Sequence, residues 1–159
     1  MRFWSIGLLF WSWLIPLQAT TVKHDVADVL DQLHTAASKA DFKAYFKLFH
    51  PDAVFIGTDA SERWDLPTFQ AYAKPHFDAG RGWTYKPGIR HIQLSPDGRT
   101  AWFDEMLDHD TYGTCRGSGV LLRGGKPEAW RVVQYHLTIP VPNDLVKDLV
   151  SMMKKLPKK

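Results

Sequence analysis

The chain has 159 residues, of which 45% are hydrophobic and 23% charged, and its formal net charge is +3. This length and composition fit one globular domain with a core of its own. The positive charge does not indicate a nucleic-acid-binding face, because four lysines lie in the C-terminal "KKLPKK" and no basic cluster precedes it. Arg2 and these lysines account for five charges, so residues 20–153 are at −2. The tail either contacts anionic lipid or is solvated.

The N-terminus has the layout of a secretory signal peptide. Arg2 is followed by an apolar run of about 13 residues, a proline at Pro16 and a small residue at Ala19. The run is shorter than the roughly 20 residues that span a bilayer. We therefore predict a signal peptide over 1–19 and a periplasmic or secreted mature chain without stable membrane insertion. Leu17 suits the cleavage site less well than alanine, so an uncleaved membrane anchor is the alternative.

Cys115 is the only cysteine, so the mature chain has no internal disulfide. An exported domain of this kind depends on its apolar core, as bacterial periplasmic proteins commonly do. We expect Cys115 to be a buried small hydrophobe, with a reactive thiol or an intermolecular bridge as alternatives.

Three helices are predicted in the first half of the mature chain. Residues 22–41 carry apolar side chains at helical spacing: Val26, Val29, Leu30, Leu33 and Ala37. A second helix begins after the cap Asp41 and ends at His50-Pro51, and the strand 53–59 follows it. A third helix begins after Asp65, and Pro75 is expected to kink or end it.

From residue 83 the apolar period changes to two, which predicts strands. Residues 83–95 and 99–110 form one hairpin, and 113–123 and 129–141 form another. A last helix follows, with Asn143 as its cap. Helices first and a meander of long strands afterwards indicate an α+β fold, with N-terminal helices packed on one face of a strongly curved antiparallel sheet.

Several segments resemble the nuclear transport factor 2-like superfamily, and within it the SnoaL-like domains. They are "YFKLFHPDAVFIGTD", "SPDGRTAWFDE", "RGSGVLLR" and "AWRVVQYHLT", the last of which also resembles the association domain of calmodulin-dependent kinase. The resemblance covers residues 24–142 and implies a cone-shaped fold around a pocket and a homodimer through the outer sheet face. We assign 20–142 to this domain and 143–159 to a C-terminal helix and lysine-rich tail.

The resemblance does not carry over the acid–base mechanism of the ketosteroid isomerase branch. That mechanism needs an Asp base and a second, protonated Asp. The corresponding positions here are Gly57 and Ser118. Asp59 lies two residues beyond Gly57 and is either a substitute base or an Asx-turn residue, which we favour.

The stretch "WFDEMLDHD" (102–110) divides by strand alternation. Asp104 and Glu105 must face opposite sides of the sheet, so only one of them enters the cone. That carboxylate is either a general acid or base with a raised pKa or the ion-pair partner of Arg116 on the next strand. Residues 108–110 are expected at a solvated strand end. A metal site there would need His76 or His91, and no spacing requires one.

His136 occupies the histidine position of the family-like last strand and could act as a base or donate to a ligand. His24, His34 and His50 lie on predicted helix surfaces or ends and receive no role. The predicted ligand pocket is lined by Trp64, Trp83, Trp102, Asp104, Glu105, Arg116, Tyr135 and His136.

Three functions stay open. The first is binding of a small, apolar or aromatic molecule. The second is a lyase or isomerase that uses Asp104 or Glu105 with His136 as its acid/base pair. The third is a dimerising accessory domain without chemistry. No nucleotide, hydrolase or metalloprotease motif is present, so no cofactor or metal is predicted.

Overall fold

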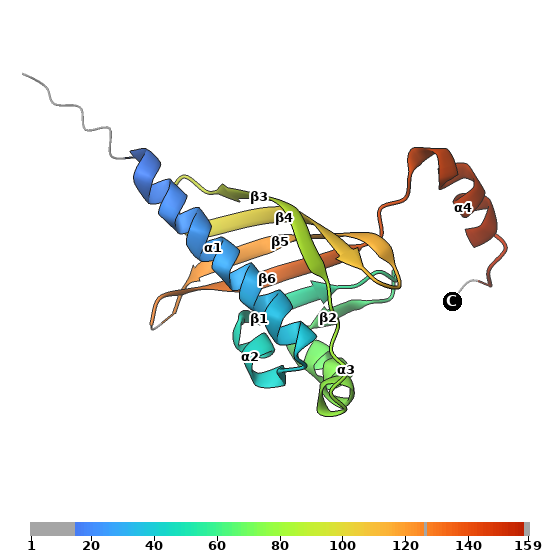
Figure 1. Cartoon of the computed structure of the whole chain (residues 1–159), viewed down its shortest axis with the longest axis horizontal. Coiled ribbons are helices and arrows are strands. Elements are labelled where there is room, and N and C mark those ends of the chain that lie inside the picture. The colour runs from blue at the N-terminus through green and yellow to red at the C-terminus, as the bar shows by residue number, and fades with distance from the viewer. Residues whose placement is uncertain (1–14, 126, 158–159) are drawn as a thin grey trace, which may run out of the picture.

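A computed structural model describes residues 15–125 and 127–157, and the side chains from residue 19 onward. The greater part of the predicted signal peptide lies outside these residues. Helices pack on one face of a six-stranded, curved sheet of order β2-β1-β6-β5-β4-β3 (Figure 1). The elements are α1 (Ile15–Ser38), α2 (Phe42–Lys47), β1 (Phe49–Ile56), β2 (Arg63–Asp65), α3 (Leu66–Asp78), β3 (Lys86–Leu94), β4 (Thr100–His109), β5 (Gly113–Gly124), β6 (Ala129–Thr138), η1 (Asn143–Leu145) and α4 (Val146–Met153).

Two of the three predicted helix caps are confirmed. Asp41 accepts a hydrogen bond from the Ala44 amide at 2.9 Å, and Asp65 accepts one from the Thr68 amide at 2.9 Å. Each bond satisfies an amide that the first helical turn leaves without a partner. α2 ends earlier than predicted, because the chain is already extended at Phe49 and His50 and joins the sheet. α3 continues through Pro75 to Asp78.

All neighbouring strands pair antiparallel except β1 and β6, which run parallel with Ile56 opposite His136. The turn at 96–98 joins β3 to β4 as predicted, and the register places Arg90 directly opposite Glu105. The short strand β2 was not predicted; it pairs with the end of β1 and begins the approach to α3.

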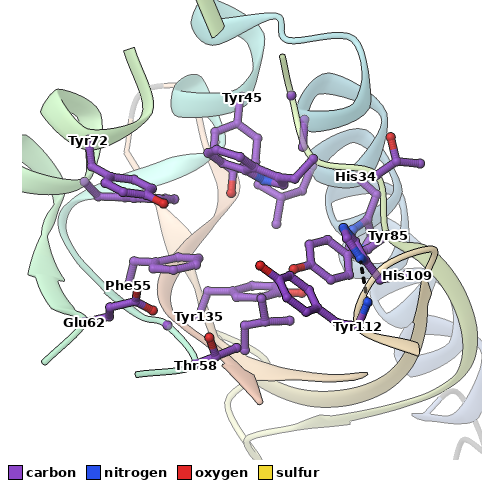
Figure 2. Close-up of a pocket in the computed structure, with 18 of the residues that line it drawn as sticks. His34, Tyr45, Phe55, Thr58, Glu62, Tyr72, Tyr85, His109, Tyr112 and Tyr135 are labelled. Carbon is purple, nitrogen blue, oxygen red and sulfur yellow. Dashed lines mark hydrogen bonds between the residues drawn. The ribbon is translucent and has the colours of Figure 1, made fainter. Parts of the chain in front are cut away.

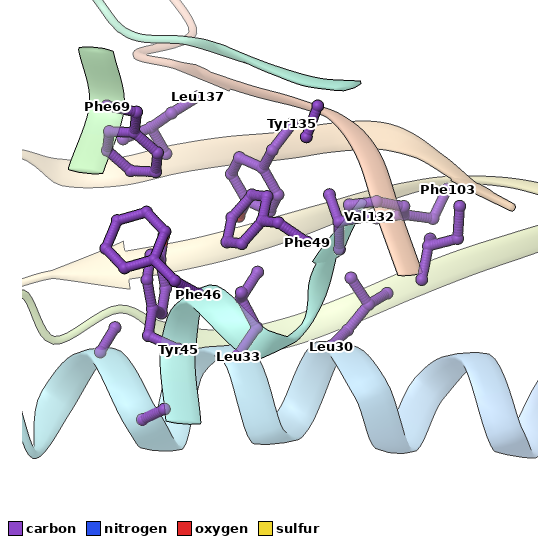
Figure 3. Packing of buried hydrophobic residues seen from close by; sticks show 14 of the residues in the cluster. Leu30, Leu33, Tyr45, Phe46, Phe49, Phe69, Phe103, Val132, Tyr135 and Leu137 are labelled. Atoms are coloured by element: carbon purple, nitrogen blue, oxygen red, sulfur yellow. The ribbon is translucent and has the colours of Figure 1, made fainter. Parts of the chain in front are cut away.

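The core lies between α1 and the concave face of the sheet (Figure 3). Leu30 and Leu33 point from α1 toward sheet residues such as Val132. Aromatic rings from α2 and α3 fill the end of the core that lies next to these two helices, where Phe46 and Phe69 have ring centroids 5.3 Å apart. Cys115 is buried, as expected, and burial raises the pKa of its thiol. The sheet and helices therefore share one continuous core.

η1 and α4 follow β6 and lie apart from the rest of the domain (Figure 1). Asn143 is not the helix cap that the sequence predicts. It is the first residue of the 3₁₀ turn η1, whose preceding residue Pro142 makes no side-chain cap bond. In the part of the chain that the structure describes, no helix is long and apolar enough to cross a membrane.

Candidate functional site

Glu105, and not Asp104, points to the concave side of the sheet. The side chain of Glu105 has no solvent exposure, whereas that of Asp104 is about half exposed. Asp104 lies on the outer face, where its Oδ2 is 3.1 Å from His91 Nδ1 on the neighbouring strand. Strand alternation thus separates the two carboxylates into a buried one and a solvated one.

Glu105 is held by side chains from three other elements. His34 Nε2 on α1 and the Tyr135 hydroxyl on β6 both contact Oε1, at 2.8 and 3.2 Å. Arg90 on β3 donates from Nε to Oε2 at 2.8 Å. The ion-pair partner is therefore Arg90, and the prediction of Arg116 is wrong. Arg116 lies opposite Met106 and is exposed on the outer face.

Arg90 extends this network to the helix that crosses the sheet. Its Nη1 lies 2.8 Å from Asp31 Oδ1 and donates to the Ala27 carbonyl oxygen at 3.2 Å. α1 is thus fixed to β3 and β4 by charged hydrogen bonds in addition to its apolar stripe. Gly117, directly opposite Glu105, leaves the space for this arrangement, because a Cβ there would lie 3.1 Å from Glu105 Oε1 and closer still to the Tyr135 hydroxyl.

The network sets the ionisation of its members. Burial alone would raise the pKa of Glu105, but the hydrogen bond and charge of His34 and the charge of Arg90 outweigh it and lower this pKa. Burial, together with the neighbouring Glu105 charge, raises the pKa of the Tyr135 hydroxyl well above its ordinary value. Glu105 is therefore a carboxylate and Tyr135 a neutral phenol at physiological pH.

A cavity of about 490 Å³ lies between the helices and the sheet, next to this network (Figure 2). His34 and Tyr135 belong both to the cavity wall and to the network, so Glu105 lies directly behind the wall. The cavity is lined by Leu33, His34, Ala37, Tyr45, Phe55, Gly57, Thr58, Glu62, Trp64, Phe69, Tyr72, Gly82, Trp83, Thr84, Tyr85, His109, Asp110, Thr111, Tyr112, Tyr135 and Leu137.

Aromatic rings form two opposite walls. On one side Phe55 stacks on Phe69, with centroids 4.0 Å apart and planes at 16°, and Trp64 and Tyr72 extend the wall outward at 4.5 Å from each other. The other side is made by Tyr85, His109 and Tyr112, with the His109 ring 4.7 Å from the first and 4.8 Å from the second. Figure 2 shows the two groups facing each other, with Tyr45 above and Tyr135 below.

The mouth of the cavity is made by two turns. The β1–β2 turn contributes Thr58 and Glu62, and the β4–β5 turn contributes residues 110–112. Asp59 in the first turn accepts from the Ser61 amide at 2.9 Å, which is the Asx-turn that the sequence favours. Asp110 in the second turn pairs with Lys86 at 2.8 Å and is exposed, as expected of a solvated strand end.

The structure divides the predicted pocket residues into two groups. Trp64, Trp83 and Tyr135 line the cavity, and Glu105 lies behind its wall. Four residues lie on the outer face of the sheet and do not reach the cavity: Trp102, Asp104, Arg116 and His136. The strand register explains this result. Asp104, Ser118 and His136 are cross-strand neighbours, so all three must face away from the side that Glu105 occupies.

The pairing of a carboxylate with His136 is therefore wrong. The histidine beside the carboxylate is His34, which the sequence reading left without a role. Its position carried a signal, because His34 lies one turn after Leu30 and next to Leu33, inside the apolar stripe of α1. The sequence did not indicate Tyr85 and Tyr112, because one lies just before β3 and the other in the β4–β5 turn. In such segments the side chains follow neither the helical nor the strand periodicity.

No group of three or more His, Cys, Asp or Glu side chains is placed to hold a metal ion among the described residues. His91, one of the two histidines considered for such a site, pairs with Asp104 on the outer face, away from residues 108–110. The other, His76, lies in the last turn of α3 and packs against Tyr72 with ring centroids 5.4 Å apart.

Comparison with known proteins places the fold. The profile of the SnoaL-like domain matches residues 26–142. Similar solved structures include an NTF2-like protein of unknown function from Pseudomonas putida (TM-score 0.66, 12% identity, covering 79% of this chain and 91% of that one). Another is a domain of unknown function with a cystatin-like fold from Nostoc punctiforme (TM-score 0.67, 12% identity, covering 87% of this chain and 88% of that one). A third is an NTF2-like protein from Cytophaga hutchinsonii (TM-score 0.58, 19% identity, covering 74% of this chain and 98% of that one). A search of curated proteins gives no match.

The substitution Glu105→Gln tests the network. It keeps the shape of the side chain but removes the charge that compensates Arg90, so we expect the free energy of unfolding to fall by about 3 kcal/mol. The folded protein lowers the pKa of Glu105 below 4.5, so the stability that this carboxylate contributes is complete above about pH 4.5 and lost as the pH falls through the lowered pKa. The difference in the free energy of unfolding between the parent chain and Glu105→Gln should therefore become smaller in acid. Urea unfolding followed by tryptophan fluorescence at several pH values measures both effects.

Asp104→Asn is the matched control. It makes the same chemical change one residue away, on the exposed outer face, and should alter stability by no more than about 0.5 kcal/mol. Equal losses in the two variants would show that the buried network is not what stabilises the fold.

Proposed function

The chain belongs to the SnoaL-like domain family, and from this premise we propose that its cavity binds a small, flat, largely apolar molecule. The observation that carries the proposal is the cavity of about 490 Å³ between two aromatic walls. Ligand pockets of proteins commonly have volumes of about 300–1,000 Å³ and are lined by apolar and aromatic side chains with a few polar groups. The size and the lining of this cavity both match that description.

The aromatic walls favour a planar ligand. Phe55, Phe69 and Trp64 have ring planes within 19° of one another, so this wall is a stack of near-parallel rings. His109 and Tyr112, stacked at 21°, form a second stack on the opposite side. A flat ring system between the two stacks would meet aromatic rings on both sides, and each such contact stabilises binding by about 0.5–1.5 kcal/mol beyond the burial of area.

Two polar groups at the inner wall would orient the ligand. The Tyr135 hydroxyl and the His34 ring are both fixed by Glu105 Oε1, so neither needs to reorganise on binding. With Nε2 donating to the carboxylate, His34 Nδ1 is the acceptor of the neutral ring, and it has no hydrogen-bond partner among the described residues. A hydroxyl or protonated amine on the ligand would satisfy it.

Replacement of Trp64 by alanine should weaken the binding of a planar probe. We expect the Kd for 2-naphthol, measured by fluorescence titration, to rise about tenfold, because one face of the wall is lost. Trp102→Ala is the matched control, since Trp102 is about half exposed on the outer face of the sheet. Its Kd should equal that of the parent chain.

Tyr72→Ala provides a second variant with little effect on folding, since Tyr72 is also about half exposed and contacts Trp64. It should raise the Kd several-fold. An unchanged Kd in both cavity variants, or an equal change in Trp102→Ala, would contradict binding between the aromatic walls.

A proton-transfer enzyme of lyase or isomerase type is the second candidate. It is favoured by the 2.8 Å contact between Glu105 Oε1 and His34 Nε2 in the cavity wall. The carboxylate orients the ring through Nε2, which leaves Nδ1 as the group that takes a proton from a bound substrate. This version of the hypothesis replaces His136 by His34.

His34→Gln separates this candidate from simple binding. The protein should exchange the α-hydrogens of 2-tetralone for deuterium, and His34→Gln should slow this exchange about 100-fold or more while the ketone still binds. Proton NMR in deuterated buffer measures the rate. His91→Gln, a histidine that also pairs with a carboxylate but on the outer face, is the control. If the parent chain and His34→Gln exchange at the same rate, the enzyme hypothesis is wrong and binding alone stays proposed.

The proposal also keeps the export and the homodimer. Export is supported by the layout of residues 1–19, and cleavage after Ala19 is the expected processing step. Pairing through the outer sheet face is supported by the large apolar side chain of Trp102, which is about half exposed there. Both features fit a periplasmic domain that holds a small molecule.

A further inference from the structure

The C-terminal helix exposes an apolar face that no other part of the described chain covers. No residue of η1 or α4 is buried. Seven large apolar side chains between residues 145 and 156 are at least 37% exposed: Leu145, Val146, Leu149, Val150, Met152, Met153 and Leu156. We call this set the α4 face. A helix of this kind in water leaves much apolar surface unburied, which marks an interaction site.

The α4 face is continuous. With 3.6 residues per turn, its seven side chains fall within an arc about 160° wide. The polar residues of the segment share the opposite side, and Lys147 and Lys154 lie at the border of the arc, next to Val150. Long lysine side chains at such a border can place their charge in a polar layer while their stems lie along an apolar one.

All of the chain's formal net charge is found in this segment. Residues 143–159 contain five lysines and two aspartates, which gives +3, the value for the whole chain. Residues 1–142 are therefore at zero. The apolar face and the positive charge thus occur together in the last 17 residues, a combination that fits a surface with an apolar layer beneath negative charges.

The position of α4 is also fixed by the fold. β6 ends at Thr138, and its partner Arg116 lies three residues after Gly113, where β5 begins. Since β1 runs parallel to β6, the β1–β2 turn lies at the same end of the sheet. The β1–β2 turn and the β4–β5 turn, which immediately precedes Gly113, form the cavity mouth. α4 therefore leaves the domain at the end where the cavity opens. The connector 139–142 contains two prolines, which makes it a stiff spacer.

We propose that α4 docks the domain on an anionic membrane surface, with the α4 face in the interfacial layer and the lysines on the lipid headgroups. A bilayer supplies negative charge and an apolar layer at one surface, and it accommodates a helix of this length lying in its plane. The cavity mouth then faces the side of the domain that is attached to the lipid. The docking is independent of the proposed ligand.

The test uses the full chain with a fluorescent label at either face of α4. Met153→Cys places the environment-sensitive dye NBD on the α4 face, and Ser151→Cys places it on the polar face as the matched control. Cys115 is buried and stays unlabelled in the folded protein. The probes are vesicles of phosphatidylglycerol and phosphatidylcholine in equal amounts, and vesicles of phosphatidylcholine alone. A local label reports on α4 whatever the N-terminal segment of the chain does.

We expect the label at 153 to shift to shorter wavelength and brighten with the anionic vesicles, and the label at 151 to stay unchanged. Lys154→Gln with Lys155→Gln should weaken this response roughly tenfold or more, as measured by the lipid concentration at its midpoint. Phosphatidylcholine alone should give a much weaker response.

Two results would overturn the proposal. The first is a label at 153 that does not respond to anionic vesicles or responds no more than the label at 151. The second is a change at 153 that follows the protein concentration in the absence of lipid, which would assign the α4 face to a second copy of the chain.

Discussion

A carboxylate without solvent exposure is the constraint on which the arrangement of this domain depends. Such a group is tolerated only when charges and hydrogen bonds replace its hydration, and Glu105 has all of its partners on other elements. These partners are His34 on α1, Arg90 on β3 and Tyr135 on β6. Loss of Arg90 would leave the buried charge of Glu105 uncompensated, and loss of His34 or Tyr135 would remove a hydrogen bond to Oε1, so the network fixes where the helix crosses the sheet.

The cavity follows from that placement. With α1 held against β3 and β6, its apolar stripe covers one part of the concave face, and the aromatic rings of α2 and α3 cover the part nearest those helices. The remaining space near the β1–β2 and β4–β5 turns stays open and is walled by rings. Because His34 and Tyr135 take part in both the network and the wall, the buried charge also orients the polar groups that meet a ligand.

Much of the fold could be predicted from local sequence patterns. The part of the site that could not be predicted depends on tertiary contacts. The caps Asp41 and Asp65 and the α+β order follow from short-range chemistry. Alternation places Asp104 and Glu105 on opposite faces, but it does not say which face is concave, because only the packing of α1 decides that. The turn at 96–98 already sets Arg90 opposite Glu105. The family-like motif around His136 suggests a pocket residue, but strand register sets His136 on the outer face beside Ser118.

We propose that the space between the two aromatic walls holds a planar molecule. A crystal structure of the protein purified from its own cells, without added ligand, tests it most directly. We expect electron density for a flat molecule between Phe55 and Tyr112, with a polar group directed at His34 or Tyr135. A cavity closed by the rings of Tyr72 and Tyr112 in contact with each other would contradict it.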